Sequence, residues 1–482
     1  MVITRVAPSP TGFPHVGTAY QALFDYVWAK KNQGRFLLRL EDTDLKRFVP
    51  GSERVIYESL DWLGLAPDES PEKAGSSGPY RQSERLALYT KYARQLVEAG
   101  HAYYCFCSAE RLTQLRTEQE KNHLPPRYDR LCSNISPEAA AARVAGGEQS
   151  VIRLRVPDNR TITVNDFLRG PVNFESAQID DQVLLKSDGF PTYHLALVVD
   201  DHLMGITHVF RGEEWLPSAP KHVLLYEMLC WSEPVWIHLP LLKNPGGSKI
   251  SKRQGHTSIF WYRDEGFLPE AVVNFLALVE WSPRGEKEVF SLAEMIKDFR
   301  LEDLRKAAAI FDLPKLYWLN GMYLRGMTNT DLYGRLVRFA KETDNKNLTA
   351  KLETHHELVL KILPLIKERI KTLKEFESWT DFFFGPVSLT PADFTGLVSF
   401  NKDSWTGLQA ELIQCQWTKE SMNDGVRAFI EKQSLPGKNF LMAVRLAITG
   451  KKISPPLWES MEILGKELCL ARLKPVEEMI FN

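Results

Sequence analysis

A loop rich in proline and glycine, APSPTGFPHVGT at residues 7–18, carries His15 and Gly17 between an apolar run and a helical pattern. Proline fixes the backbone and lacks an N–H donor, whereas glycine lets a ligand approach the backbone closely. A loop of this kind, leaving a strand and entering a helix, presents free N–H groups and the positive helix end to an anion. The loop therefore predicts an anion site. A turn whose side chains only cap the helix is the alternative.

A second stretch, KISKRQGH at residues 249–256, places Lys249 and Lys252 three residues apart in a segment flanked by glycine and serine. Two lysines on a loop could neutralise phosphates as charge builds in a transition state. For an isolated pair of lysines, a solvated basic turn is the alternative. The stretch KKIS at 451–454 has no following lysine, and we assign it no role.

The elements around the first loop must position these residues. VITRV (2–6) and FLLRL (36–40) are typical of buried strands. Between them, apolar residues recur at helical spacing: Tyr20, Leu23, Phe24, Val27 and Trp28. Strand, helix and strand in this order predict a parallel α/β sheet. Because ligands bind at the carboxyl ends of such strands, we expect Arg5 and Glu41 to face that crevice.

The rest of the chain changes character twice. Residues 101–186 combine a cysteine cluster, a charged helical pattern at 109–121 and short strand patterns, which predicts a mixed α/β insertion. LALVVDDHLMGITHVFRGEEW (195–215) returns to the α/β pattern. No long strand pattern occurs after about residue 320, so the C-terminal third is predicted to be all-α.

Composition limits the class of protein. The 482 residues are 44% hydrophobic and 25% charged, with a net charge of −1, so any basic surface for a nucleic acid must be local. No apolar run reaches the roughly 20 residues that span a bilayer. The N-terminus also lacks the apolar segment of a signal peptide. We therefore expect a cytoplasmic protein without a membrane partner. Six cysteines in a chain of this length do not make a disulfide framework.

Together the two stretches resemble the signatures of class I aminoacyl-tRNA synthetases: PHVGT is similar to the HIGH motif and KISKR to the KMSKS loop, in the same order. Other segments resemble bacterial glutamyl-tRNA synthetases, including RVAPSPTGFPHVGTAYQALFDY, RLEDTD, GPYRQSERLALY and FDLPKLYWLNGMYLR. The resemblance runs over almost the whole length and is densest over 2–90 and 180–325.

The resemblance implies an enzyme that uses ATP and Mg²⁺ to convert L-glutamate to glutamyl-adenylate. It then transfers the acyl group to the 2′-hydroxyl of the terminal adenosine of tRNA-Glu. The substrate carboxylate is itself the nucleophile, so the site must supply alignment and charge stabilisation on the triphosphate. The implied fold is a Rossmann-like catalytic domain with an α/β insertion, followed by an all-α anticodon-binding region. We expect a monomer.

The resemblance also assigns roles to matching positions. The nucleotide set is His15, Gly17, Thr18, Glu214, Leu242, Lys252 and Lys249, with His15, Gly17 and the two lysines as the catalytic residues; Thr18 stands where the family motif usually has a second histidine. The glutamate set is Arg5, Ala7, Ser9, Glu41, Tyr193 and Arg211. Arg5 and Arg211 would meet the side-chain carboxylate and Glu41 the α-ammonium. An arginine fork suits a carboxylate and rejects the amide of glutamine. A structural ion pair of Arg211 with Glu213 or Glu214 is the alternative.

The same resemblance divides the chain. The catalytic domain would be 1–100 and 187–245, the insertion 101–186 would contact the tRNA acceptor end, and 246–325 would be a stem-contact domain with the KISKR loop. Two helical anticodon-binding subdomains would follow at 326–385 and 386–482. IKERIKTLKEF (366–376) is predicted to be a basic amphipathic helix. Arg369 falls where glutamate-specific members carry an arginine that reads the third anticodon base, which predicts an enzyme that refuses tRNA-Gln.

Three clustered cysteines raise the question of a metal. Cys105, Cys107 and Cys132 follow a CxC…C spacing in the insertion, and three thiols fit a structural Zn²⁺ site, which takes four N or S ligands. Some family members carry zinc in this region. Where a histidine would serve as fourth ligand this chain has Asn134, so Tyr128 and His123 are the candidates. A degenerate site with three free thiols is the alternative.

Several other classes of protein share parts of this pattern. Glutaminyl-tRNA synthetase shares the class, but its amide substrate needs no cationic fork such as Arg211. A non-discriminating enzyme would charge both tRNAs. Shortened paralogues that modify a tRNA base, and nucleotidyltransferases with a HIGH motif, lack the C-terminal helical region. A degenerate, synthetase-like RNA-binding protein would have eroded catalytic positions, whereas His15, Gly17, Glu41, Arg211 and Lys252 are all present.

Overall fold

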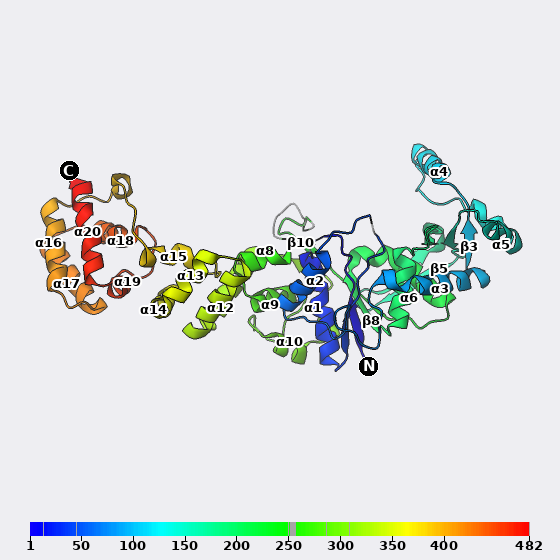
Figure 1. Ribbon diagram of the computed structural model, residues 1–482, viewed down its shortest axis with the longest axis horizontal. Helices are drawn as coiled ribbons and strands as arrows, with labels where there is room; N and C mark the ends of the chain where they lie inside the picture. The colour runs from blue at the N-terminus through cyan, green and yellow to red at the C-terminus, as the bar shows by residue number, and fades with distance from the viewer. Residues whose placement is uncertain are drawn as a thin grey trace. The chain divides into compact units, whose positions relative to one another are not determined.

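In the computed structural model, the residues described are 1–12, 14–44, 46–248, 250, 257–285, 287–307 and 309–481. They form two compact units, Met1–Trp261 with Val272–Asp312, and Tyr262–Ala271 with Leu313–Asn482. The helices α8 (Ile259–Asp264) and α9 (Pro269–Glu280) contribute residues to both units. Figure 1 labels the elements of each unit.

Parallel strands form the centre of the first unit. β1 (Ile3–Val6) pairs in parallel with β2 (Arg35–Leu38), and β8 (His208–Gly212) pairs in parallel with β9 (Val235–Leu239). Thr207, which precedes β8, donates its backbone N–H to the carbonyl of Ile3 at 2.9 Å, so β8 starts beside β1. The predicted parallel α/β sheet is confirmed, and its strands run with their carboxyl ends toward one edge.

Two strands of the segment 101–186 extend this sheet. β5 (Thr161–Asp166) and β6 (Gly170–Glu175) form an antiparallel hairpin, and the strand order is β6-β5-β9-β8. Asp166 lies opposite Trp236 in the parallel pairing of β5 with β9. The other strands of the segment form a separate antiparallel sheet, made of β3 (Ala102–Cys105), β4 (Val151–Leu154) and β7 (Val183–Leu185).

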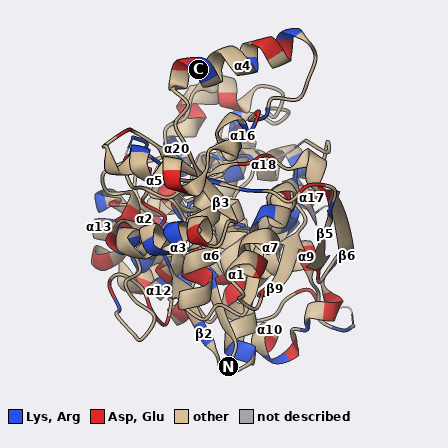
Figure 2. Cartoon of the chain, turned by 90° about the vertical axis from the view of Figure 1, so that its right-hand side faces the viewer, with Lys and Arg blue, Asp and Glu red and all other residues tan. Residues whose placement is uncertain are grey.

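The first helix forms as the apolar spacing predicts. α1 (Val16–Lys31) buries Tyr20, Leu23, Phe24 and Val27, and the imidazole of His15 caps its first turn. The remaining helices of the unit are α2 (Ser52–Trp62), α3 (Leu86–Glu98), α4 (Ala109–Lys121), α5 (Pro137–Ala145), α6 (Tyr193–Leu203), α7 (Ala219–Met228) and α10 (Leu292–Asp298). The charged helix predicted at 109–121 is α4, which has no buried side chain and carries both acidic and basic residues (Figure 2). The short strands β10 (Leu242–Lys243) and β11 (Ala309–Ile310) pair in parallel.

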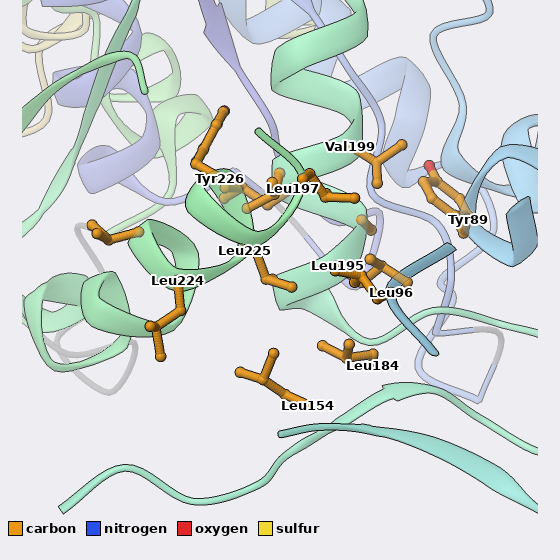
Figure 3. Close-up of a cluster of buried hydrophobic side chains, with 14 of the residues drawn as sticks. Tyr89, Leu96, Leu154, Leu184, Leu195, Leu197, Val199, Leu224, Leu225 and Tyr226 are labelled. Atoms are coloured by element: carbon orange, nitrogen blue, oxygen red, sulfur yellow. The ribbon is translucent and has the colours of Figure 1, made fainter. Parts of the chain in front are cut away.

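One buried apolar cluster fixes the helices that flank the sheet. Leucines and valines of α6 meet leucines of α7, and residues of α3, β4 and β7 complete the cluster (Figure 3). The labelled members are Tyr89, Leu96, Leu154, Leu184, Leu195, Leu197, Val199, Leu224, Leu225 and Tyr226. Because close-packed interiors resist movement, α6 and α7 present their polar residues in fixed positions.

The described residues of the second unit form helices joined by loops, and no strand, as predicted for the C-terminal third. Its helices are α11 (Leu313–Gly326), α12 (Asn329–Glu342), α13 (Lys346–Thr354), α14 (His356–Ile366), α15 (Glu375–Phe384), α16 (Lys402–Gln414), α17 (Lys419–Lys432), α18 (Gly437–Thr449), α19 (Leu457–Leu464) and α20 (Lys466–Phe481). It holds two buried apolar clusters, one centred on α12–α15 and one on α16–α20. In the part of the chain that is described, no helix combines the length and the apolarity needed to cross a membrane.

The helix predicted at 366–376 is wrong. α14 ends at Ile366, turns follow, and α15 begins at Glu375. The backbone of this segment hydrogen-bonds to distant partners: the Asn320 side chain donates to the Lys371 carbonyl, and Leu373 N–H donates to the Gly266 carbonyl at 2.9 Å. These contacts from elsewhere in the unit replace the helical ladder that the local spacing favours.

Candidate active site

The residues predicted to bind glutamate line one cavity of about 800 Å³. They come from β1 and the loop after it, from the chain following β2, from the first residue of α6, and from β8. The members are Arg5, Ala7, Ser9, Glu41, Tyr193 and Arg211. The cavity therefore lies at the carboxyl ends of the parallel strands, where open α/β sheets bind ligands.

Arg5 is held by a buried carboxylate. Its Nε and Nη2 donate to the two carboxylate oxygens of Asp201 at 3.1 and 3.0 Å, and Arg39 Nη1 donates to the same carboxylate at 2.6 Å. Burial alone would raise the pKa of Asp201, but the charges of Arg5 and Arg39 outweigh it and hold that pKa below its ordinary value. The positive charge of Arg5 is thus compensated, and its guanidinium is fixed in orientation.

Sequence reasoning missed this ion cluster. Asp200 and Asp201 follow the apolar run LALVV in α6, and both are fully buried. Two adjacent acids in an apolar helix require cationic partners, which was the available signal. The partners of Asp200 are Arg85 at 2.6 Å, with Gln82 and Tyr89.

Glu41 lies at the rim of the same cluster. Its Oε1 is 3.4 Å from Nη2 of Arg39. Burial raises the pKa of Glu41 to about 7, against the opposing charges of Arg39 and Arg5. The carboxyl group can therefore change its charge near neutral pH, and an arriving ammonium would favour the ionised form.

Arg211 has a different environment from Arg5. Its Nε donates to Nε2 of His238 at 2.9 Å, and its Nη1 donates to Nδ1 of His222 at 3.2 Å. The guanidinium carbon lies 4.8 Å from the centre of the Trp236 ring. Burial lowers the pKa of Arg211. Its Nη2 is buried and, among the described residues, has no hydrogen-bond partner.

The ion pair considered for Arg211 is not formed within the described part of the chain. The carboxylate of Glu213 pairs with Arg169 and accepts from the backbone N–H of Leu241 at 3.3 Å. Glu214 lies in the 3₁₀ segment Glu213–Ser218, where its carboxylate covers Gly212; a Cβ there would stand 2.0 Å from Oε2. Arg211 thus lines the cavity with its Nη2 unpaired among the described residues.

The loop at the start of α1 is hydrogen-bonded to the residues that follow position 256. Nδ1 of His15 accepts a hydrogen bond from Gly17 N–H at 3.0 Å, so His15 does cap the helix. His15 forms a β-bridge with Ser258, and Val16 N–H donates to the carbonyl of Thr257 at 2.7 Å. Lys249 and Lys252 lie outside the described residues.

Of the stretch 249–257, the structure describes Ile250 and Thr257. Ile250 N–H donates to the carbonyl of Leu242 at 3.3 Å, and Thr257 lies beside His15. Thr18 lines a small apolar pocket behind the loop. Among the residues predicted to bind ATP, Leu242 is thus bonded to Ile250, and His15 pairs with Ser258. His15, Gly17, Thr18, Glu214 and Leu242 do not line the 800 Å³ cavity.

A family model matches the part of the chain that contains this site. The model "tRNA synthetases class I (E and Q), catalytic domain" matches residues 1–318, where E and Q are the one-letter codes of glutamate and glutamine. The chain belongs to this synthetase family. A second model, "Anticodon binding domain", matches residues 331–476 of the synthetase.

Relatives of this synthetase match it from end to end. The glutamate–tRNA ligase of Acidothermus cellulolyticus is 44% identical, over 98% of this chain and 95% of its own. That of Acinetobacter baumannii strain AYE is 44% identical over 99% and 94%. The crystal structure of a glutamate–tRNA ligase from Elizabethkingia meningosepticum, in complex with its amino acid, superposes with a TM-score of 0.90 at 37% identity, covering 99% of both chains.

The synthetase carries its three clustered cysteines in one place. The sulfur atoms of Cys105, Cys107 and Cys132 lie within 4.8 Å of one another, with 3.6 Å between Cys107 and Cys132. The Tyr128 hydroxyl is 3.4 Å from the sulfurs of both Cys105 and Cys107. Four thiolates around zinc with bonds of about 2.3 Å would stand about 3.8 Å apart, so this donor set fits the ion. His123 is exposed and is not part of the group.

Arg369 lies in the second unit of the synthetase, in the turn after α14. It is exposed, and its guanidinium carbon is 5.8 Å from the centre of the Trp379 ring. An exposed arginine over an aromatic ring offers donors to a polar ligand while its carbon chain stays packed.

Proposed function

We propose that this synthetase is a glutamate–tRNA ligase that discriminates against tRNA-Gln. It would activate L-glutamate with ATP and Mg²⁺ and transfer the acyl group to the 3′-terminal adenosine of tRNA-Glu. One observation carries the amino-acid assignment: a buried arginine with an unpartnered donor among the described residues and a partly exposed carboxyl group line the same cavity, as glutamate with its side-chain carboxylate and its α-ammonium requires.

The chemistry of the first step needs few protein groups. The α-carboxylate of glutamate attacks the α-phosphate of ATP, and pyrophosphate leaves. No base is required, because the nucleophile is already ionised. Arg5, Arg211 and Glu41 would orient the amino acid, and orientation of this kind converts a bimolecular reaction into an effectively unimolecular one. The α1 N-terminus with His15 and Gly17 would face the phosphates, and Lys252 with Lys249 would balance charge on the leaving pyrophosphate.

Different segments of the chain would carry different functions. We propose that 1–100 with 187–245 is catalytic, that 101–186 and 246–325 contact the acceptor end and stem, and that 326–385 and 386–482 bind the anticodon. The separate buried clusters around α12–α15 and α16–α20 support the last division. Arg369 would contact the third anticodon base.

The cysteine cluster would hold one structural Zn²⁺. Cys105, Cys107 and Cys132 would supply thiolates and Tyr128 the fourth ligand, since its hydroxyl is the oxygen placed among the sulfurs. The ion would fix the β3 end of the insertion and take no part in the reaction.

Aminoacylation with labelled glutamate tests the proposal, using tRNA-Glu and tRNA-Gln in separate reactions. Charging of tRNA-Glu alone is the expected result. Charging of both tRNAs would keep the ligase and reject discrimination. Charging of neither, with ATP, Mg²⁺ and intact tRNA present, would favour the degenerate, synthetase-like protein.

A further inference from the structure

Arg211 sits at the centre of a buried chain of histidines that the mechanism above does not use. Along this chain, Asp166 contacts His238, His238 and His222 each contact Arg211, and His222 contacts His194. Asp166, His222 and His238 are at most 3% exposed. The chain joins the ends of β5, β8 and β9 to the helices α6 and α7.

Hydrogen-bond chemistry fixes the protonation of His238. Asp166 Oδ2 accepts from the backbone N–H and from Nδ1 of His238, at 3.0 and 2.7 Å. A guanidinium can only donate, so Nε2 of His238 must accept from Arg211. The ring is therefore neutral, with its proton on Nδ1. Burial lowers the pKa of His238, which agrees with this assignment.

His222 is a second neutral acceptor by the same reasoning. Its Nδ1 accepts from Arg211, so its proton is on Nε2 and is donated to Nδ1 of His194 at 2.9 Å. Burial and the charge of Arg211 hold the pKa of His222 well below its ordinary value. The helices that carry them, α6 for His194 and α7 for His222, pack against each other through the apolar cluster (Figure 3).

We propose that His222, His238 and Asp166 are positioning residues that set the selectivity of this site for a carboxylate over an amide. The two histidines hold Arg211 as neutral acceptors, so among the described residues no carboxylate hydrogen-bonds to its guanidinium. Arg5 differs from Arg211, because its Nε and Nη2 donate to the carboxylate of Asp201. A carboxylate ligand in the cavity therefore meets a guanidinium that no carboxylate of the described residues binds directly, whereas a neutral amide would gain only a hydrogen bond from it. This inference rests on the proposed glutamate site and extends it to residues that need not touch the substrate.

A matched pair of substitutions separates charge from shape. His222→Asn and His222→Asp both place an oxygen near the position of Nδ1, and both leave the same small cavity. Only the aspartate compensates the charge of Arg211. We expect His222→Asp to raise KM for glutamate at least tenfold over His222→Asn, while the weak use of glutamine changes little. The ratio of kcat/KM for glutamate over glutamine would then fall at least tenfold in His222→Asp alone.

A third variant tests the orientation of His238. In Asp166→Asn one carboxylate oxygen becomes an NH₂ group. Because Oδ1 of Asp166 already accepts from the backbone N–H groups of Leu168 and Arg169, the NH₂ group would face His238. It would favour the tautomer with a proton on Nε2, which repels Arg211. We expect Asp166→Asn to raise KM for glutamate more than it lowers kcat.

The readouts are tRNA-dependent pyrophosphate exchange with each amino acid and calorimetric binding of glutamate, with melting temperatures as the check on folding. Wild-type activity on glutamate must be present first; its absence would reject the proposed function rather than this inference. An active wild type, with equal glutamate-to-glutamine ratios in folded His222→Asn and His222→Asp, would overturn the inference.

Discussion

Glu41 couples the binding of the amino acid to pH. Its pKa is raised to about 7 by burial, and only its ionised form attracts the α-ammonium. Glutamate itself keeps its charges between about pH 6 and pH 8, since its groups titrate outside this range. We expect the dissociation constant for glutamate to be nearly constant above pH 7 and to rise as pH falls below it, by up to about tenfold per unit.

Calorimetry in buffers of different ionisation enthalpy checks this prediction. Binding at about pH 6 should release close to one proton, because the ammonium displaces the proton of Glu41, and binding at about pH 8 should release almost none. Glu41→Gln should bind more weakly and lose the proton release. Equal affinity and equal proton release at both pH values would contradict the role given to Glu41.

The residues proposed to bind glutamate were easier to predict than the residues that hold those side chains in place. Arg5 and Glu41 follow buried strands, and the ends of parallel strands meet at one edge, so their convergence was predictable from order alone. The resemblance added Tyr193 and Arg211. Asp201 pairs with Arg5, and His238 pairs with Asp166. Each pair joins segments more than 70 residues apart, so its hydrogen bonds exist only once the sheet has formed.

Among the elements, the strand β3, the residue Cys107 after it and the 3₁₀ turn with Cys132 supply the three thiols of the proposed zinc site, and Tyr128 would supply the fourth ligand. We expect purified protein to contain close to one zinc per chain. Cys132→Ser should remove it, and Tyr128→Phe should weaken its retention against a chelator, because one of four ligands is lost. The measurements are elemental analysis and the melting temperature.

His123→Ala is the matched control for the zinc site, because His123 is exposed and lies outside the cluster. It should retain both the metal and the melting temperature of the wild type. Far less than one zinc per wild-type chain would identify the three thiols as a degenerate site.

Element prediction succeeded for two local helical patterns, the buried apolar stripe of α1 and the exposed charged sequence of α4. α1 and α4 lie where the residue spacing places them, and β1 begins one residue later than predicted. The segment 366–376 failed because its spacing is helical while its backbone bonds to Asn320 and Gly266. Local pattern carries no information about such partners. The same reason hid the pairing of β5 with β9, which adds part of the insertion to the sheet.

For the whole molecule, the residues that we propose to select the amino acid and the tRNA lie in different units. Arg211 lies in the first unit and Arg369 in the second. We expect Arg369→Gln to lower the preference for tRNA-Glu over tRNA-Gln by about tenfold, the loss of one charge-assisted contact to a base. KM for glutamate should stay unchanged.

Competition between the two tRNAs in aminoacylation measures this preference. Lys361→Gln is the control, because Lys361 is an exposed cation on α14 within the same unit. An Arg369→Gln enzyme with the wild-type preference would remove Arg369 from anticodon recognition.

The hairpin of β5 and β6 has a consequence for engineering. Asp166 ends β5 within the segment 101–186, and its carboxylate contacts Arg211 on β8 through His238. A chimaera that takes residues 101–186 from a relative therefore imports a residue that supports Arg211 of the cavity, together with the surface proposed to contact tRNA. The segment is not an interchangeable cassette: a graft that ends before β5 leaves the pocket intact, and one that includes β5 must match the histidine on β9.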